Sequence, residues 1–211
     1  MSHTKNSTRA TISAVSLESF GYSRVALVLT GSAMTQAMPY WIEWARAAAP
    51  DTEFRVIVRE TAYRFTTRHN LESRLRAHVQ DDCWEDEIIA SHIELAEWAE
   101  LIIIYPATLD YSAKLSHCVT ESPSLLAALS TEAVVCIAPS LPPRSWDNPL
   151  VREVFERLRK PKNFIVIDPV PGPSESSDTA LAWIPPLLPD VLRRLEEHRT
   201  THQQVSEERS A

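Results

Sequence analysis

The sequence RVALVLTGSA, residues 24–33, determines the class of fold. Residues 24–30 form an almost continuous apolar run that is rich in β-branched residues, which is typical of a strand buried on both faces of a parallel sheet. Gly31 ends the run, and Ser32 is a common N-cap residue. Apolar residues then recur at helical spacing, with Pro39 among them. We therefore expect a strand, a tight turn, and a helix that is either kinked at Pro39 or begins there.

Similar apolar runs recur along the chain and predict strands at residues 54–58, 101–105, 133–138 and 164–167. Helical segments separate them, at residues 62–78, 91–100, 114–129 with a break near Pro123, and 148–160. Strands that alternate with helices predict an α/β fold with a doubly wound parallel sheet and right-handed crossovers. A length of 211 residues suits a single domain.

The remaining segments have polar or proline-rich sequences. We expect a disordered leader at residues 1–23, an acidic loop at 79–90, irregular coil at 169–177 and 185–189, a charged helix at 191–202, and a polar tail at 203–211. The domain would therefore span residues 24–202.

Composition excludes several classes of function. The net charge is −7 and no basic run is present, which argues against binding to nucleic acid or to an anionic membrane. No apolar run is long enough to span a bilayer. Cys83, Cys118 and Cys136 have neither CxxC spacing nor the spacing of metal ligands. We expect a reduced, cytoplasmic protein without a metal site.

The residues that directly follow the strands are the first candidates for a ligand site, because parallel sheets bind ligands at the carboxyl ends of their strands. Gly31 and Ser32 follow the first strand, and one glycine is too few for a dinucleotide fingerprint. A phosphate site and a purely structural turn both remain open there. Thr61, after the second strand, would either cap the next helix or hold a phosphate oxygen.

His92 is the histidine best placed for chemistry. Ser91 and Glu94 have the spacing of a capping box, which would put His92 at the first helical position. The positive end of a helix disfavours an imidazolium there and favours a neutral ring that can accept a proton. The alternative is an exposed polar residue without a catalytic role.

The stretch His92-Ile93-Glu94-Leu95, with Trp98-Ala99 and a following strand that ends in Pro106-Ala107, carries the most specific family signal. Weaker matches are Thr30-Gly31-Ser32, Thr61-Ala62 with Phe65, Ala113-Lys114-Leu115, and Trp146 with Asn148-Pro149. Over residues 24–168 the chain resembles the flavin-containing cysteine decarboxylase family. This family includes phosphopantothenoylcysteine decarboxylase and the peptidyl-cysteine decarboxylases of lantibiotic-type peptide biosynthesis.

The resemblance implies a flavodoxin-like Rossmann fold that binds FMN, in a homo-oligomer built from trimers, with the flavin at a subunit interface. His92 would be the catalytic base. By position, the flavin-binding residues would be Gly31, Ser32, Ala33, Thr61, Ala62, Tyr63, Thr108, Leu109, Asp110, Tyr111 and Ser140. In the family FMN oxidises a cysteine-type substrate to a thioaldehyde, carbon dioxide leaves, and an enethiol remains.

Three positions concern the substrate. Asp110 stands where the family has an asparagine, so a negative charge lies where a substrate carboxylate is expected. Pro142 replaces the asparagine of a second family motif, and Arg144 is a candidate for the missing carboxylate contact. No cysteine follows Cys136, which disfavours the coenzyme A branch, since that branch uses a late cysteine.

We therefore expect an FMN-dependent decarboxylase that acts on the C-terminal cysteine of a ribosomally made precursor peptide, in a trimer or dodecamer. The enethiol product would serve an aminovinyl-cysteine-type ring. The alternatives are an FMN-binding partner or regulatory subunit without decarboxylase activity, a phosphopantothenoylcysteine decarboxylase, and a flavin-modifying transferase of similar fold.

Overall fold

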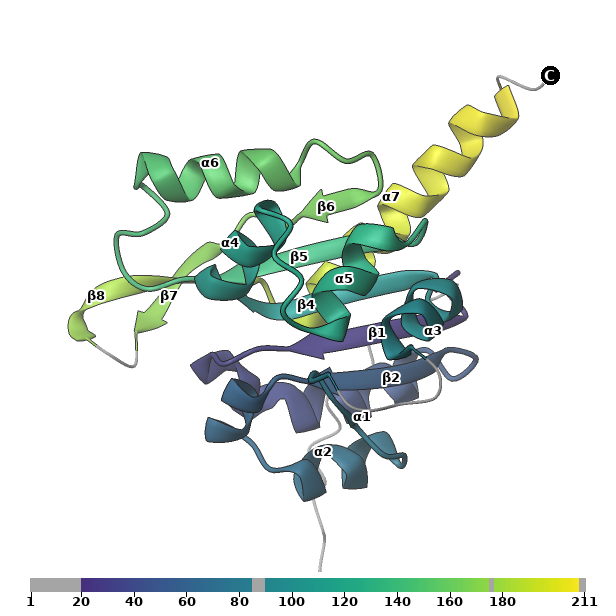
Figure 1. Ribbon diagram of the computed structural model, residues 1–211, viewed down its shortest axis with the longest axis horizontal. Coiled ribbons are helices and arrows are strands. Elements are labelled where there is room, and N and C mark those ends of the chain that lie inside the picture. The colour runs from purple at the N-terminus through teal and green to yellow at the C-terminus, as the bar shows by residue number, and fades with distance from the viewer. Residues whose placement is uncertain (1–19, 85–89, 175–176, 209–211) are drawn as a thin grey trace, which may run out of the picture.

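In the computed structural model, six parallel strands form a central sheet in the order β3-β2-β1-β4-β5-β6 (Figure 1). The strands are β1 (Arg24–Leu29), β2 (Glu53–Val58), β3 (Gln80–Asp81), β4 (Leu101–Thr108), β5 (Val134–Ser140) and β6 (Phe164–Val166). The chain runs outward from β1 to β3 and then returns to β4 on the other side of β1. The strand order therefore reverses between β1 and β4, which is where ligands of such sheets bind.

The structure describes residues 20–84, 90–174 and 177–208. Three expected segments lie partly outside these residues: the leader at residues 1–19, the acidic loop at 85–89, and the tail at 209–211. The predicted α/β fold with a doubly wound parallel sheet in a single domain is confirmed, and five strands lie where the apolar runs predicted them. The sixth, β3, has two exposed polar residues and was expected to be loop.

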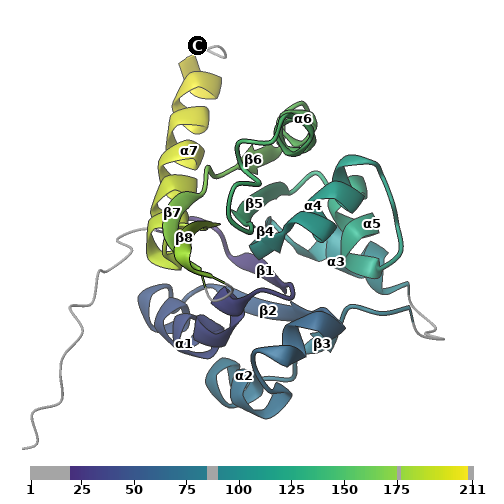
Figure 2. The same ribbon diagram turned by 90° about the vertical axis from the view of Figure 1, so that its left-hand side faces the viewer.

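Helices cover both faces of the sheet (Figure 2). One face packs on α1 (Met38–Ala48), α2 (Arg68–Leu75) and α7 (Leu188–Glu208), and the other on α3 (Ser91–Trp98), α4 (Leu109–Ser116), α5 (Pro123–Ser130) and α6 (Pro149–Leu158). Alternate residues of β1 serve the two cores, because side chains alternate along a strand: Leu27 faces the first and Val28 the second. Each such fully buried side chain contributes about 1.5–3 kcal/mol.

The turns after β1 and β2 are short 3-10 helices, η1 (Ala33–Ala37) and η2 (Glu60–Arg64). Helix α1 begins at Met38 with Pro39 in its first turn, so the helix starts at this proline and is not kinked by it. The expected helix at 62–78 is divided into η2 and α2, and the expected break near Pro123 separates α4 from α5.

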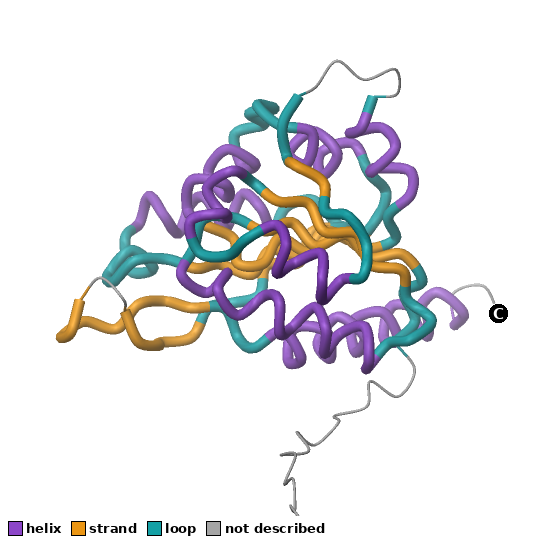
Figure 3. The backbone as a smooth tube through the Cα atoms, turned by 90° about the horizontal axis from the view of Figure 1, so that it is seen from below, coloured by secondary structure: helices purple, strands orange, loops and turns teal. Residues whose placement is uncertain are grey.

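A hairpin of β7 (Val170–Ser174) and β8 (Ser177–Ile184) projects from the domain, as Figures 1 and 3 show. The expectation of irregular coil at 169–177 is therefore wrong. Leu141 and Trp183 exchange two backbone hydrogen bonds of 2.7 and 3.0 Å, which hold the hairpin beside the carboxyl end of β5. Helix α7 is longer than the expected 191–202. Within the described ranges, no helix has the length and apolar character needed to cross a membrane.

Candidate functional site

The carboxyl ends of β1, β4 and β5 bring several hydroxyl groups together at the point where the strand order reverses. Ser32 Oγ lies 2.7 Å from Ser140 Oγ, so a hydrogen bond joins the ends of β1 and β5 across β4. Thr30 Oγ1 donates to Pro106 O at 2.5 Å and accepts from the backbone N–H of Thr108 at 3.1 Å. The structure thus unites the expected residues Ser32, Thr108 and Ser140.

Gly31 brings the turn after β2 into the same place. A Cβ added at Gly31 would lie 2.6 Å from Thr61 Cβ, closer than real Cβ atoms come to another atom, so a side chain at this position would push Thr61 away. Gly31 has no positive φ, and its requirement for glycine comes from this close approach. This close approach directly supports a structural role for Gly31 in the turn. It also places the exposed Thr61 next to the hydroxyl groups at the strand ends.

The first turn of α4 follows β4 directly. Thr108 is the N-cap, and its side chain accepts from the backbone N–H of Tyr111 at 3.4 Å. Leu109 is half-buried and Asp110 is exposed. Tyr111 is 1% exposed, and its hydroxyl lies 2.8 Å from Ser124 Oγ, so its side chain belongs to the core. Burial raises the pKa of Tyr111 above its usual value.

Not every expected flavin residue has a free side chain. Ala62, like the residue at position 111, is buried, so neither presents its side chain to a ligand in this structure. Tyr63 is half-buried and donates from its hydroxyl to Asp81 Oδ1 at 2.7 Å. Burial, followed by this hydrogen bond, raises the pKa of Tyr63. Ala33 is half-buried at the start of η1.

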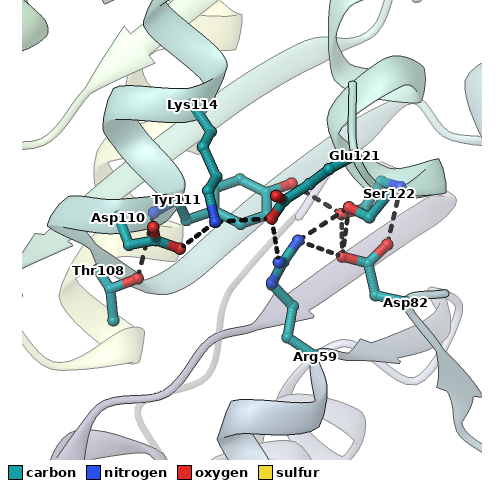
Figure 4. A network of polar contacts seen from close by, with 9 residues as sticks. Arg59, Asp82, Thr108, Asp110, Tyr111, Lys114, Glu121 and Ser122 are labelled. Atoms are coloured by element: carbon teal, nitrogen blue, oxygen red, sulfur yellow. Dashed lines mark hydrogen bonds and ion pairs between the residues drawn. The ribbon is translucent and has the colours of Figure 1, made fainter. Parts of the chain in front are cut away.

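A network of polar contacts that the sequence did not predict lies beside this turn (Figure 4). The carboxylate of Asp82 is fully buried. It accepts from Ser122 Oγ at 2.8 Å, from Ser124 Oγ at 2.7 Å and from Ser124 N at 2.9 Å. Arg59 Nη1 lies 3.1 Å from the same carboxylate. The ends of β2 and β3 are thereby fixed to the start of α5.

The network continues as a chain of alternating charges toward the surface. Arg59 Nη2 lies 2.6 Å from Glu121 Oε1, and Lys114 Nζ lies 2.7 Å from the same oxygen. Lys114 Nζ also lies 2.8 Å from Asp110 Oδ2. Burial lowers the pKa of Arg59, but Asp82 and then Glu121 outweigh it, so the net pKa is raised. Asp110, which the sequence left as an unbalanced charge, is therefore paired.

Two cavities adjoin the network. The first, of about 430 Å³, is lined by residues of β2, η2 and the end of β3, and Arg59, Thr61 and Tyr63 form part of its wall. The second, of about 280 Å³, lies between β3, α3 and α5. Asp81 and Cys83 line both cavities, so the two are neighbours.

His92 belongs to α3 and is not among the residues that bond to Ser32, Thr108 or Ser140 at the strand ends. It does not line the first cavity, and α3 lies toward the end of the sheet opposite to the β7–β8 hairpin (Figure 1). Its half-buried ring meets the ring of Trp84 edge to face, with centroids 5.4 Å apart. The Nδ1 atom of His92 is buried, with no hydrogen-bond partner among the residues described.

The expected capping box does not form. Ala90 is the N-cap of α3, Ser91 is its first residue, and His92 is its second rather than its first. The Glu94 carboxylate pairs instead with Arg55 of β2 at 2.8 Å, because a cross-element ion pair competes with the local cap for the same side chain.

The loop between β5 and α6 contains the other expected substrate residues. Pro142 and Arg144 are both exposed, and Arg144 has a left-handed φ of 66°. Trp146 is buried, with its ring centroid 5.2 Å from Phe155 and 6.4 Å from Trp183 of the hairpin. The aromatic contacts anchor this loop between α6 and β8, while Pro142 and Arg144 face outward.

The Flavoprotein family profile matches residues 14–195. The chain therefore belongs to the flavoprotein family, whose members include peptidyl-cysteine decarboxylases and phosphopantothenoylcysteine decarboxylases, and the resemblance seen in the sequence is confirmed.

Two relatives illustrate the range of the family. Over 130 residues the chain is 28% identical to the cypemycin cysteine dehydrogenase (decarboxylating) of Streptomyces sp, covering 61% of this chain and 68% of that protein. Over 120 residues it is 30% identical to the Coenzyme A biosynthesis bifunctional protein CoaBC of Bacillus subtilis (strain 168), covering 56% of this chain and 29% of that protein. The chain thus spans under a third of the bifunctional relative.

Solved structures share the fold. The cypemycin decarboxylase CypD superposes with a TM-score of 0.71 at 24% identity, over 88% of this chain and 98% of that chain. The FMN-dependent cysteine decarboxylase SpaF gives a TM-score of 0.69 at 20% identity, over 83% and 96%. The FMN binding protein AtHal3 gives 0.65 at 16% identity, over 87% and 97%.

The strand-end residues suit the phosphate end of a flavin nucleotide. Ser32, Thr61, Thr108 and Ser140 provide hydroxyl donors, and none of these four carries a negative charge that would repel a phosphate. Three of them lie where the strand order reverses, and the fourth borders the first cavity. The donor chemistry therefore fits a phosphate-bearing flavin.

Proposed function

We propose that the chain is an FMN-dependent decarboxylase that acts on the C-terminal cysteine of a ribosomally made precursor peptide. The observation that carries this proposal is the convergence of Ser32, Thr61, Thr108 and Ser140 at the strand ends of a chain that belongs to the flavoprotein family. These hydroxyls would hold the phosphate and ribityl groups of FMN. A reducing, cytoplasmic location and a homo-oligomeric state are part of the proposal.

Bound FMN would supply the oxidising power of the reaction, by accepting two electrons and a proton from the cysteine side chain. The chain's own contribution is to orient the cysteine and to receive its second proton. Nδ1 of His92 is buried, so Nε2 is the ring nitrogen that would take the thiol proton. The cysteine thereby becomes a thioaldehyde.

Loss of carbon dioxide follows from the chemistry of the thioaldehyde. When the bond between the α-carbon and the carboxylate breaks, its electron pair moves toward sulfur, and the C=S bond becomes a C=C bond with a thiolate. Protonation of that sulfur gives the enethiol. The substrate has then lost one carbon dioxide and two hydrogens.

A homo-oligomer would account for how His92 reaches the flavin. Helix α3 lies toward the other end of the sheet from the hairpin, and His92 does not line the cavity that borders Thr61. A second copy that presents its α3 to the strand ends would bring the base and the flavin together. Light scattering should give a trimer or dodecamer, whereas a monomer that turns over substrate would contradict this arrangement.

The first experiment combines flavin loading with mass spectrometry. Protein supplied with FMN should become yellow and should remove the mass of one carbon dioxide and two hydrogens from a synthetic peptide that ends in cysteine. His92→Asn should keep the flavin and lose turnover, while His69→Asn, an exposed histidine of α2, should behave as the wild type. Protein that stays colourless in excess FMN would refute the proposal.

A mixing experiment tests whether two copies share a site. A Ser32→Ala, Ser140→Ala variant should bind FMN poorly, and His92→Asn should bind it without turnover. If the base and the flavin come from different copies, mixed oligomers of the two variants should regain part of the activity. Mixed oligomers without any activity would place both groups in one copy.

The second candidate is an FMN-binding partner or regulatory subunit without decarboxylase activity. Asp110 and Pro142, which replace two asparagines of the family motifs, favour it. Under this alternative the yellow protein would leave every peptide that ends in cysteine intact. A phosphopantothenoylcysteine decarboxylase would instead act on that small substrate, which serves as a third sample in the same assay.

A further inference from the structure

The proposed reaction, on which this inference depends, requires a free carboxylate next to the flavin. A protein with a net charge of −7 repels such a group, so a local cation has to meet it. Near the strand ends the described part of the chain offers several cations, among them Arg59, Lys114 and Arg144. Arg68 is already paired with Asp81, and Arg64 is exposed at the end of η2. The contacts of the other three distinguish them.

Arg59 and Arg144 are poor receptors for opposite reasons. The guanidinium of Arg59 is only 16% exposed and already meets Asp82, Ser122 and Glu121. Arg144 is exposed on the loop after β5, and its side chain has no partner among the described residues to orient it. An unrestrained side chain loses rotamer entropy when it binds, which weakens the contact.

Lys114 is both accessible and oriented. Its side chain is 28% exposed, and its ammonium has three N–H donors. Two of them are directed to Asp110 at 2.8 Å and to Glu121 at 2.7 Å, which leaves one donor. The hydrogen bonds that Lys114 donates to these two carboxylates raise its pKa, so the ammonium stays charged.

The position of Lys114 also agrees with a role in substrate binding. Asp110 lies in the first turn of α4, two residues after the strand-end Thr108. Glu121 shares one carboxylate oxygen between Lys114 and Arg59, and Arg59 lines the first cavity. The ammonium therefore links the first turn of α4 to the residues around Arg59, and Figure 4 shows it between Asp110 and Glu121.

We propose that Lys114 binds the terminal carboxylate of the peptide substrate through its remaining N–H, and that Asp110 competes with this carboxylate for the same ammonium. Glu121 and Arg59 then act as positioning residues that hold the lysine in place. Asp110, with a side chain 66% exposed, is the partner that can be displaced. The negative charge at position 110 thus tunes the affinity for the substrate without excluding a carboxylate.

Peptide binding to FMN-loaded protein tests this proposal. The probe is a fluorescein-labelled synthetic hexapeptide that ends in cysteine, compared with the same peptide as a C-terminal amide, and fluorescence anisotropy gives the affinities. All variants carry His92→Asn, so no peptide is consumed. Arg157→Met is the matched control, since Arg157 forms an i,i+4 ion pair of 2.7 Å with Glu153 on α6, away from the site.

Lys114→Met should weaken binding of the carboxylate peptide about tenfold or more and leave the amide peptide unchanged, because a hydrogen bond between two charged groups is lost. Asp110→Asn should tighten binding of the carboxylate peptide about two- to fivefold, as expected for removing an exposed competitor. Lys114→Arg should keep the preference for the carboxylate. Arg157→Met should change neither affinity.

Two results would overturn the proposal about Lys114 alone: a Lys114→Met protein that still prefers the carboxylate peptide, or an Asp110→Asn protein that binds it more weakly. If Lys114→Met fails to fold, Lys114→Arg and Asp110→Asn decide the matter. A parent protein that binds FMN but does not distinguish carboxylate from amide would refute both this inference and the peptide substrate. Failure to bind FMN would refute the proposed function itself.

Discussion

Replacement of Asp82 by alanine should be among the most damaging single changes in the chain. The Asp82 carboxylate is fully buried and accepts three hydrogen bonds from Ser122 and Ser124, besides its ion pair with Arg59. Removing one partner of a buried pair costs about 3–5 kcal/mol, since the other charge is left without compensation. Arg59 is only 16% exposed and keeps its contact with Glu121, but Ser122 and Ser124 also lose their acceptor, so the loss stays in this range.

Urea unfolding followed by tryptophan fluorescence measures this effect. With a slope of about 2 kcal/mol per molar urea, the midpoint for Asp82→Ala should fall by about 1.5–2.5 M. Asp82→Asn keeps one acceptor oxygen and should lose about half as much. Asp168→Asn is the control: Asp168 pairs with Arg159 at 2.5 Å but is 70% exposed, so it should cost below about 1 kcal/mol. An Asp82→Ala protein within 1 kcal/mol of the wild type would refute the reasoning.

Three further predictions concern single positions. Gly31→Ala places a Cβ 2.6 Å from Thr61 Cβ, so it should cost about 1–3 kcal/mol of stability in urea unfolding and reduce the flavin absorbance of protein reconstituted with FMN. Tyr111→Phe removes the hydroxyl bonded to Ser124 and should cost about 1 kcal/mol with unchanged flavin content; a loss of flavin would mean that this hydroxyl also contacts the ligand. Burial opposes the charge of Glu196, but hydrogen bonds lower its pKa overall, so its contribution to stability is present above its unfolded pKa of about 4.3 and is lost as pH falls through the lower folded value. Glu196→Gln should therefore flatten the acid limb of the stability–pH curve, and an unchanged limb would count against a stabilising role for the contacts of Glu196 with Arg199 and with the backbone N–H of Gly21.

The core of the fold was predictable because its signal is local. The strands β1, β2, β4, β5 and β6 are apolar runs, and buried parallel strands require such runs. The other three strands lack this signal. β3 is short and polar, and β7 contains Pro171 and Pro173, which are read as coil signals. The pairing of β8 with Leu141 joins residues more than 40 positions apart, which no local pattern indicates.

The residues of the candidate site also fall into those that the sequence predicts and those that it does not. Ser32, Thr108 and Ser140 could be found because topology alone brings strand ends together. The partners of Arg59 were missed, since Asp82 and Glu121 meet it only through tertiary packing. The useful signal was a charged residue directly after a buried strand, which requires a partner nearby.

The edges of the main sheet constrain how copies of this chain can meet. The outermost strands, β3 and β6, have only two and three residues, and the outer strand of the hairpin contains two prolines that cannot donate to a neighbouring strand. These edges disfavour pairing in which one copy extends the sheet of another. The proposed homo-oligomer is therefore expected to form through side chains on helices and loops, so surface substitutions there should separate the copies while each domain stays folded.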